Sequence, residues 1–336
     1  MEPVLIKILS SFLISLVITM SLGPLAIPFL KRMKFGQSVR NDGPSRHLRK
    51  SGTPTMGGII FLAGIAVAGV LQASKSLEGV LVLGMTLAFG LIGFLDDFVK
   101  VALKRPLGLR AREKFLGQLL LSLAAAAFSV AVLGRGTDIV VPYSGFLVPG
   151  GFSWELGGLG FFLFTVLVIT GTANAVNLTD GLDGLAAGVA ALVAAAYLPV
   201  ALLQAKSDVA AIMAAVSGGC LGFLFYNRHP ARVFMGDTGS LALGSAFGTV
   251  ALITRSELFL LIIGGIFVLE TLSVIIQIAS FQLFGRRIFK MSPLHHHFEL
   301  CNWSENKVVV SFWAVTMIFA VLGLIGFYHL EAYFLK

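Results

Sequence analysis

Long apolar stretches alternate with short polar segments along the whole chain. A transmembrane helix needs about 20 mostly apolar residues. Stretches of about this length lie at roughly 4–30, 55–73, 77–95, 114–133, 158–177, 184–204, 209–226, 238–254, 257–281 and 308–330. The pattern predicts an all-α polytopic membrane protein of about ten transmembrane helices, in which residues 1–336 form one membrane domain.

The first apolar stretch is too long for the core of a signal peptide, and it lacks a basic start and a clear small-residue cleavage site. We expect it to stay in the protein as a helix that bends near Gly23-Pro24 and Pro28, because proline interrupts helical hydrogen bonding.

Composition supports a lipid environment. AVILMFWYC residues make up 57% of the chain and charged residues 12%, and the mean hydropathy is +0.90. Soluble domains carry about 25% charged residues. The net charge of +8 comes from basic residues in short loops between apolar stretches. That distribution suits anionic lipid and phosphorylated substrates, and it excludes nucleic acid as the expected partner.

The two cysteines do not resemble a disulfide pair. Cys220 lies in an apolar stretch and Cys301 in a polar loop, so we assign neither a redox nor a metal role.

The distribution of Lys and Arg predicts the orientation. One set of loops, at 31–54, 96–114, 174–183, 227–237 and 282–307, holds 19 of the 25 basic residues. Positive residues favour the cytoplasmic side, so both termini are expected outside, which agrees with an even number of spans. In the outer loop 137–156, alternating β-formers around Pro149-Gly150-Gly151 predict a small external β-hairpin.

Nearly all unusual polar residues fall at the cytoplasmic ends of the predicted helices. A transporter would be expected to place ionisable residues near the middle of the membrane. Only Glu270 lies deep in a predicted span, and we expect a buried carboxyl group hydrogen-bonded to a neighbouring helix.

Asp96 and Asp97 end an apolar helix and are followed by Lys100, Lys104 and Lys114. Negative charge is unfavourable at a helix C-terminus, so a divalent cation or these lysines must offset it. Adjacent helical side chains point about 100° apart, which makes divided roles plausible. The alternative interpretation is an interfacial charge pair balanced by lysines.

The segment 174–184 places Asn174, Asn177, Asp180 and Asp183 three residues apart, which favours one helix face. The alternative is that Thr179 or Asp180 caps the next helix.

The segment 227–240 contains Asn227, Phe234 and Asp237. Asp237 precedes a Gly-rich helix, where it is either an N-cap or a metal ligand with free helix amides nearby for phosphate. Phe234 either stacks on a base or anchors the loop in lipid.

Two further motifs suit phosphate binding. Three consecutive histidines, His295, His296 and His297, do not readily share one zinc ion, and we expect no cysteine partner for them. Histidines that donate to phosphate oxygens fit better, with Gln277 and the basic Arg286, Arg287 and Lys290 upstream. The basic, Gly-rich segment 49–58 offers backbone amides and Lys50 to phosphate, but it does not match a Walker A loop. Carboxylates together with phosphates are the usual magnesium arrangement, so the motifs together indicate phosphoryl transfer at a membrane surface.

At these motifs, which extend from Lys50 to Glu299, the chain resembles the phospho-N-acetylmuramoyl-pentapeptide transferase family of the polyprenyl-phosphate N-acetylhexosamine-1-phosphate transferase superfamily. The resemblance implies UDP-N-acetylmuramoyl-pentapeptide as donor, undecaprenyl phosphate as acceptor, lipid I and UMP as products, Mg²⁺ as cofactor and a homodimer. It also implies a bacterial plasma membrane location, an active site on the cytoplasmic face and a role in peptidoglycan synthesis.

The resemblance also implies roles for individual residues. Asp237 is similar to the metal ligand, and Asp96 and Asp97 are similar to the acceptor-activating acid and its supporting acid. The residues similar to the uridine pocket are Gly181, Leu182, Asp183 and Phe234. The residues similar to the other substrate contacts are Lys50, Thr55, Lys104, Arg112, Lys114, Asn174, Asn177, Asp180, Asn227, Gln277, His295, His296 and His297.

Two alternatives stay open at this point. One is a sister enzyme that transfers N-acetylglucosamine 1-phosphate, against which the histidine run and the 50–58 loop count. The other is a transporter of a lipid-linked sugar, against which the scarcity of mid-membrane charge counts. The sequence leaves open a one-step or two-step reaction and the third residue of the stem peptide.

Overall fold

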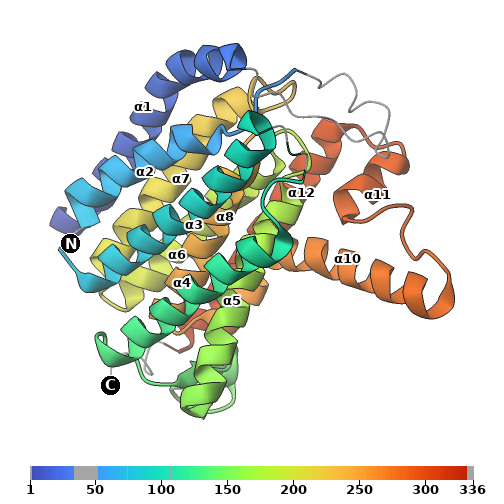
Figure 1. Cartoon of the computed structure of the whole chain (residues 1–336). Helices are drawn as coiled ribbons and strands as arrows, with labels where there is room; N and C mark the ends of the chain where they lie inside the picture. Colours follow the sequence, from blue (N-terminus) through green and yellow to red (C-terminus); the bar gives the residue numbers. More distant parts are fainter. Residues whose placement is uncertain (1, 34–51, 74, 104, 106, 331–336) are drawn as a thin grey trace.

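The computed structural model describes residues 2–33, 52–73, 75–103, 105 and 107–330. Helices dominate this part of the chain (Figure 1). Their bounds are Glu2–Arg32 (α1), Gly58–Ala73 (α2), Leu77–Ala102 (α3), Ala111–Ala131 (α4), Gly157–Thr179 (α5), Leu185–Leu203 (α6), Ser207–Asn227 (α7), Gly236–Ile253 (α8), Glu257–Ile263 (α9), Gly265–Phe284 (α10), Leu294–Leu300 (α11) and Glu305–Tyr328 (α12).

Every predicted span corresponds to helical structure, so the predicted all-α polytopic fold is confirmed. In the described residues, eight helices are long and apolar enough to cross a membrane: α1, α3, α4, α5, α6, α7, α10 and α12. The other two predicted spans are α2, which is a shorter apolar helix, and α8. Helix α1 contains Pro24 and Pro28, and Figure 1 shows it turning towards its C-terminal end, as predicted.

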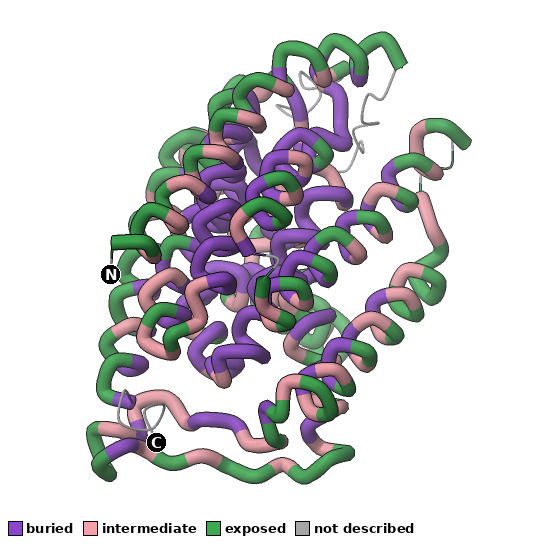
Figure 2. Tube along the Cα trace, turned by 90° about the vertical axis from the view of Figure 1, so that its left-hand side faces the viewer, coloured by how far each residue is buried: buried purple, intermediate pink, exposed green. Residues whose placement is uncertain are grey.

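The two innermost helices are α7 and α8. Helix α7 packs against α1, α2 and α6, whereas α8 packs against α3 and α5. Every residue of α8 from Thr238 to Ile253 is buried, and Figure 2 shows buried segments running through the centre of the bundle. The Gly, Ala and Ser residues of α8 permit this close packing between helices. Its first turn is thereby held among the ends of the neighbouring helices.

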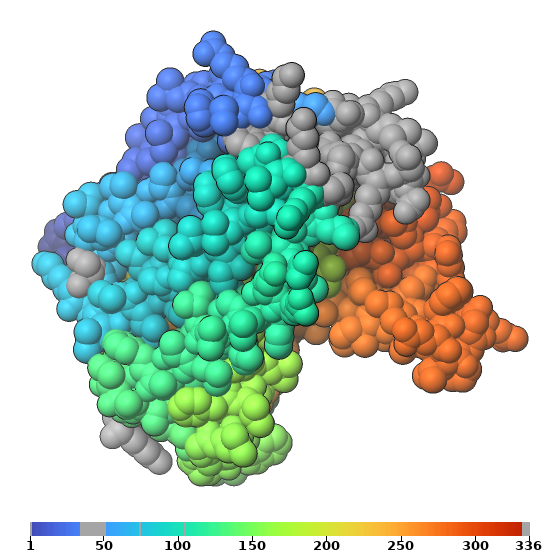
Figure 3. All heavy atoms as spheres, in the orientation of Figure 1, coloured from blue at the N-terminus to red at the C-terminus, as the bar shows by residue number. Residues whose placement is uncertain are grey.

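The span predicted at 257–281 is not one helix, because it divides at Gly264 into α9 and α10. Helix α10 then leaves the bundle, and together with α11 it projects from the body of the molecule (Figures 1 and 3). Phe281, Leu283 and Phe284 near its end are exposed, as expected for side chains that face lipid. Helix α11 carries the three histidines, so a segment that the apolar pattern left unassigned is helical.

The predicted hairpin is confirmed, since Asp138–Val140 (β1) pairs antiparallel with Ser153–Glu155 (β2). It is tied to the C-terminal part of α12 by the hydroxyl group of Tyr143, which donates to the carbonyl oxygen of Leu322 (2.9 Å). Near the start of α1, Lys7 pairs with Asp208 at the start of α7. Because α1 starts and α12 ends at this end of the bundle, the predicted placement of both termini on one side fits the structure.

Candidate active site

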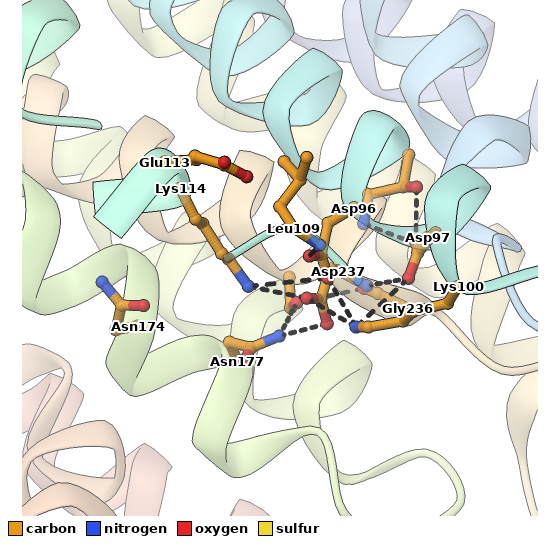
Figure 4. Close-up of polar contacts among 12 residues, drawn as sticks. Asp96, Asp97, Lys100, Leu109, Glu113, Lys114, Asn174, Asn177, Gly236 and Asp237 are labelled. Carbon is orange, nitrogen blue, oxygen red and sulfur yellow. Dashed lines mark hydrogen bonds and ion pairs between the residues drawn. The ribbon is translucent and has the colours of Figure 1, made fainter. Parts of the chain in front are cut away.

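Three carboxylates from two distant segments of the sequence meet at the opposite end of the bundle. Asp96 and Asp97 lie in the last turns of α3, and Asp237 lies in the first turn of α8 (Figure 4). The packing of α3 against α8 brings them together, and one oxygen of each lies within 4.8 Å of the others. Asp96 and Asp97 are each 2% exposed. Such burial of carboxylates requires compensating partners.

Asp97 is fully engaged with the start of α8. Its Oδ1 accepts a hydrogen bond from the Asp237 N–H (3.2 Å), and its Oδ2 accepts from the N–H (2.9 Å) and the hydroxyl group (2.7 Å) of Thr238. Asp97 therefore caps α8 from another helix. The prediction that these amides are free for phosphate is wrong, because Asp97 already occupies them. The alternative that Asp237 is the N-cap is wrong as well, since the N-cap position is Met235.

Asp96 points elsewhere, as expected for adjacent residues on a helix. Its Oδ1 accepts a hydrogen bond from the N–H of Leu109 (2.8 Å). Its Oδ2 lies 2.5 Å from Lys100 Nζ and 3.9 Å from Lys114 Nζ. The two adjacent acids thus have different partners. Asp97 binds backbone amides of α8, whereas Asp96 mainly contacts lysines.

Asp237 is the point where the polar groups converge (Figure 4). Its Oδ2 lies 2.6 Å from Lys114 Nζ and 3.0 Å from Lys100 Nζ, and its Oδ1 accepts a hydrogen bond from Asn177 Nδ2 (2.9 Å). Asn177 also donates to the hydroxyl group of Ser240 (2.8 Å). Lys100 therefore touches Asp96 and Asp237 together, and its ammonium group shows that a cation fits between these carboxylates.

The segment after α5 only partly follows the predicted helix face. Asn174 and Asn177 are helical, but α5 ends at Thr179, so Asp180 and Asp183 lie in the turn beyond it. The alternative that Thr179 or Asp180 caps α6 is wrong, because the N-cap position of α6 is Gly184. Desolvation, followed by repulsion from Asp237 and Asp97, raises the pKa of Asp180 well above its usual range.

Asn174 lies one helical turn from Asn177 and is exposed. Its Nδ2 donates to Gln118 Oε1 (2.8 Å) and to the carbonyl oxygen of Thr170 (2.8 Å). Gln118 is a buried residue of α4 that the sequence did not single out. It lies one turn beyond Lys114 on the same helix, and that i, i+4 spacing is the signal that could have found it.

A second group of polar residues surrounds Asp183. Its Oδ2 lies 2.9 Å from His229 Nδ1 and accepts a hydrogen bond from the N–H of Ala231 (3.1 Å). Glu305 at the start of α12 accepts a hydrogen bond from the Asp183 N–H (2.8 Å). Asn227 accepts from the N–H of Gly184 (3.0 Å). These contacts hold the 180–184 turn beside the 228–234 loop.

Backbone hydrogen bonds join the 54–58 segment to the start of α8. The N–H groups of Gly57 and Gly58 donate to the carbonyl oxygens of Phe234 (2.8 Å) and Met235 (2.9 Å). The prediction that amides of this segment bind phosphate is therefore wrong for these two residues. Thr55 is buried with its hydroxyl group beside Gly236, whose positive φ of 74° and crowded surroundings favour glycine.

The histidines point in different directions. His295 is buried and its Nδ1 lies 3.0 Å from Glu270 Oε2, which confirms the expected role of Glu270 as a buried, hydrogen-bonded carboxyl group. His296 contacts Glu299 (3.0 Å), and His297 Nδ1 accepts a hydrogen bond from the N–H of Lys290 (3.1 Å).

Gln277 binds the backbone of the loop after α10. Its carboxamide accepts hydrogen bonds from the N–H groups of Ile288 (3.0 Å) and Phe289 (2.9 Å) and donates to the carbonyl oxygen of Phe289 (2.9 Å). The structure thus places Gln277 in the support of the α10–α11 connection. Its assignment as a substrate contact stays a prediction.

Two of the predicted substrate contacts cannot be placed relative to the acid cluster, and a third is exposed at the start of α4. Lys50 and Lys104 lie outside the described residues. Arg112 is exposed in the first turn of α4. Among the described lysines, Lys100 contacts all three acids and Lys114 contacts two of them. The spacing of four between Asp96 and Lys100 was the available signal for this contact.

Comparison with known proteins agrees with this geometry. Residues 79–255 match glycosyl transferase family 4, and residues 50–62 match phospho-N-acetylmuramoyl-pentapeptide-transferase signature 1. A phospho-N-acetylmuramoyl-pentapeptide-transferase of Pelotomaculum thermopropionicum is 64% identical over 95% of this chain and 98% of its own length. The chain belongs to the phospho-N-acetylmuramoyl-pentapeptide-transferase family.

Other members of the phospho-N-acetylmuramoyl-pentapeptide-transferase family cover the chain almost completely. The relative from Desulforudis audaxviator is 58% identical over 97% of this chain and 98% of its own length. The relative from Carboxydothermus hydrogenoformans is 52% identical over 95% of this chain and 98% of its own length. The match to this transferase family therefore covers the acid cluster, the 180–184 turn and the histidine helix alike.

Proposed function

We propose that the protein transfers phospho-N-acetylmuramoyl-pentapeptide from UDP-N-acetylmuramoyl-pentapeptide to undecaprenyl phosphate, giving lipid I and UMP in the first membrane step of peptidoglycan synthesis. The observation that carries the proposal is the cluster of Asp96, Asp97 and Asp237 with Lys100 and Lys114 at the ends of membrane helices. Phosphoryl transfer depends mainly on positioning and on neutralising charge, and this cluster offers both. The names of the relatives supply the identity of the sugar.

A donor assay tests this function directly. Purified protein with undecaprenyl phosphate should release UMP from UDP-N-acetylmuramoyl-pentapeptide and not from UDP-N-acetylglucosamine. Release only from UDP-N-acetylglucosamine would support the sister enzyme. The same assay in detergent has no transmembrane gradient, so release of UMP there would exclude pure transport.

The proposed cofactor is Mg²⁺. The cluster fits such an ion because its carboxylate oxygens converge, and Mg²⁺ prefers oxygen ligands. Asp237 would hold the ion, since Asp97 is occupied by the amides of α8. When bound, the ion supplies charge neutralisation to the diphosphate of the donor. Chelation should abolish UMP release and added Mg²⁺ should restore it, whereas full activity after chelation would contradict the proposal.

The proposed reaction is a direct, one-step transfer. An oxygen of the acceptor phosphate attacks the β-phosphorus of the donor, the bond from that phosphorus to the bridging oxygen breaks, and UMP leaves with the bond electrons. Asp96 orients the acceptor or takes its proton, Asp97 fixes the start of α8, and Lys100 and Lys114 hold the phosphates. A covalent enzyme intermediate is unnecessary, because the acceptor brings its own nucleophile.

A single turnover without acceptor distinguishes one step from two. Delipidated protein with donor and Mg²⁺ should release no UMP until undecaprenyl phosphate is added. A stoichiometric burst of UMP, with the sugar phosphate retained on an aspartate, would establish double displacement instead.

The proposed location is the bacterial plasma membrane, with the acid cluster on the cytoplasmic face and the protein as a homodimer. The excess of Lys and Arg at the cluster end supports this orientation. Cysteines placed at positions 7 and 336 should react with an impermeant reagent from outside intact cells. Labelling only after permeabilisation would reverse the orientation.

A further inference from the structure

Glu270 is a carboxyl group inside a membrane helix whose two oxygens both contact one other residue. It lies in α10 and is 0% exposed. Its Oε1 accepts a hydrogen bond from the backbone N–H of His295 (3.2 Å), and its Oε2 lies 3.0 Å from Nδ1 of the same residue. A charged or polar group at this depth is costly and is usually retained for a function.

These contacts decide which ring atom of His295 remains for other interactions. A carboxylate only accepts hydrogen bonds, so with Glu270 as the acceptor it is Nδ1 that carries the ring hydrogen and donates it to Oε2. The remaining ring atom is Nε2. It is buried and has no hydrogen-bond partner in the described structure, in a residue that is 1% exposed. A buried polar atom without a partner requires an explanation.

The Nε2 atom lies against Gly181 in the 180–184 turn. A Cβ atom on Gly181 would collide with the His295 ring at Nε2, so glycine at this position allows the turn to pack directly on the imidazole. The same turn leads to Asp183, which is held by the neighbouring 228–234 loop. The free ring atom of His295 therefore borders the turn whose residues Gly181, Leu182 and Asp183 the family resemblance likens to a uridine pocket.

We propose that Glu270 is a positioning residue. From inside α10 it holds His295 so that Nε2 faces the 180–184 turn and contacts the nucleotide donor there. The proposal rests on the proposed function, because that function supplies the nucleotide. Glu270 itself touches no substrate. Its effect passes through the orientation and hydrogen placement of the His295 ring.

The decisive variant is Glu270→Gln, which keeps the shape but changes the hydrogen placement. The backbone N–H of His295 still requires the amide oxygen, so the amide NH₂ group faces Nδ1. Nδ1 must then accept a hydrogen bond, and the ring hydrogen moves to Nε2. Histidine can be labelled selectively with ¹⁵N, and His295→Gln identifies the signals of His295. In the variant, Nε2 should carry the ring hydrogen and Nδ1 should not, the reverse of the wild-type arrangement.

The kinetic effect should appear with the nucleotide donor. The KM for the donor should rise about 10- to 100-fold, by analogy with the loss that follows removal of a carboxylate orienting a metal-binding imidazole. The KM for undecaprenyl phosphate should stay within about twofold, because a change in uniform binding of one substrate leaves the other unaffected. The proposal would be overturned if the ring hydrogen moved to Nε2 and the donor KM stayed unchanged. It would also be overturned if the ring hydrogen stayed on Nδ1.

A matched control separates this role from the general cost of neutralising a buried acid. Glu257→Gln makes the same chemical change in a buried carboxyl group at the opposite end of the bundle, where it pairs with Arg135. It should leave both KM values unchanged in the folded protein.

A second variant covers the case in which Glu270→Gln does not fold. Gly181→Ala keeps Glu270 and has an acceptable φ, since Gly181 is not among the positive-φ residues. Its methyl group should displace the His295 ring and raise the donor KM in the same way. If wild-type protein released no UMP, the proposed function would fail, whereas the ¹⁵N signature would still test the contact between Glu270 and His295.

Discussion

The two ends of the bundle contain similar charged residues in different arrangements. At the end with the hairpin, the described ion pairs match four cations with four acids: Lys7 with Asp208, Lys206 with Glu78, Arg135 with Glu257, and Arg255 with Asp138. At the other end, Lys100 and Lys114 are shared among the three clustered aspartates.

The difference indicates that the charged residues at the hairpin end stabilise packing, whereas those at the acid-cluster end are suited to chemistry. A matched pair neutralises itself and holds two chain segments together. Three carboxylates that share two ammonium groups retain negative charge, and their contacts are suited to exchange with other cations and phosphates. Structural ion pairs and functional clusters use the same residue types, so the stoichiometry of the contacts is the distinguishing feature.

The largest expected effect is a loss of stability in a variant that breaks a matched ion pair. Arg135 donates to Glu257 and also to the carbonyl oxygens of Leu252 (2.8 Å) and Asp138 (2.6 Å). Arg135→Met should lower the free energy of unfolding by about 3–5 kcal/mol, because it leaves a buried carboxylate uncompensated. Denaturation in detergent measures this loss. Turnover per folded molecule should stay near the wild-type value, and a large loss of turnover would remove the distinction between the two ends.

The next effect tests the cluster itself. Asp237→Asn should lower kcat by about 10²–10³ or more, since the proposed metal site supplies several kcal/mol and each tenfold is about 1.4 kcal/mol. Stability should change little, because asparagine has the same shape. Steady-state UMP release at saturating Mg²⁺ measures the drop, with Asp208→Asn as the matched control. Near-normal turnover would exclude Asp237 from the metal site.

The smallest effect sharpens the comparison between two lysines. Lys114→Gln removes the ammonium group 2.6 Å from Asp237 and should lower kcat/KM about 10- to 100-fold, as for a lost charged hydrogen bond. Lys206→Gln removes a matched cation at the other end and should leave kcat/KM unchanged. Equal losses in both variants would show that the effect is one of stability.

Much of the fold follows from the sequence because hydrophobicity is a property of short segments. Local composition predicts the ten apolar stretches and the small hairpin. The count of basic residues predicts that both termini lie on the same side of the membrane. The break at Gly264 did not follow, because both halves of that stretch are equally apolar and only the surrounding helices decide where the chain turns.

The candidate site was predicted as a set of residues but not as an arrangement. The acids, amides and histidines stand out as polar groups at the ends of apolar helices. Their partners do not, and the amides that seemed free for phosphate are bound by Asp97 or by the 234–235 backbone. A local motif shows that a donor needs an acceptor without showing which distant residue provides it.

By itself, the sequence determined that this chain lies in a membrane and which residues are available for phosphate chemistry, since apolar length and residue type are independent of the other segments. Only the tertiary structure decided that Asp97 caps α8 across 140 residues of sequence, that Lys100 and Lys114 are shared by the acids, and that Glu270 holds His295. The physical reason is that burial makes every polar group require a partner, and helix packing alone determines which partners come within hydrogen-bonding distance.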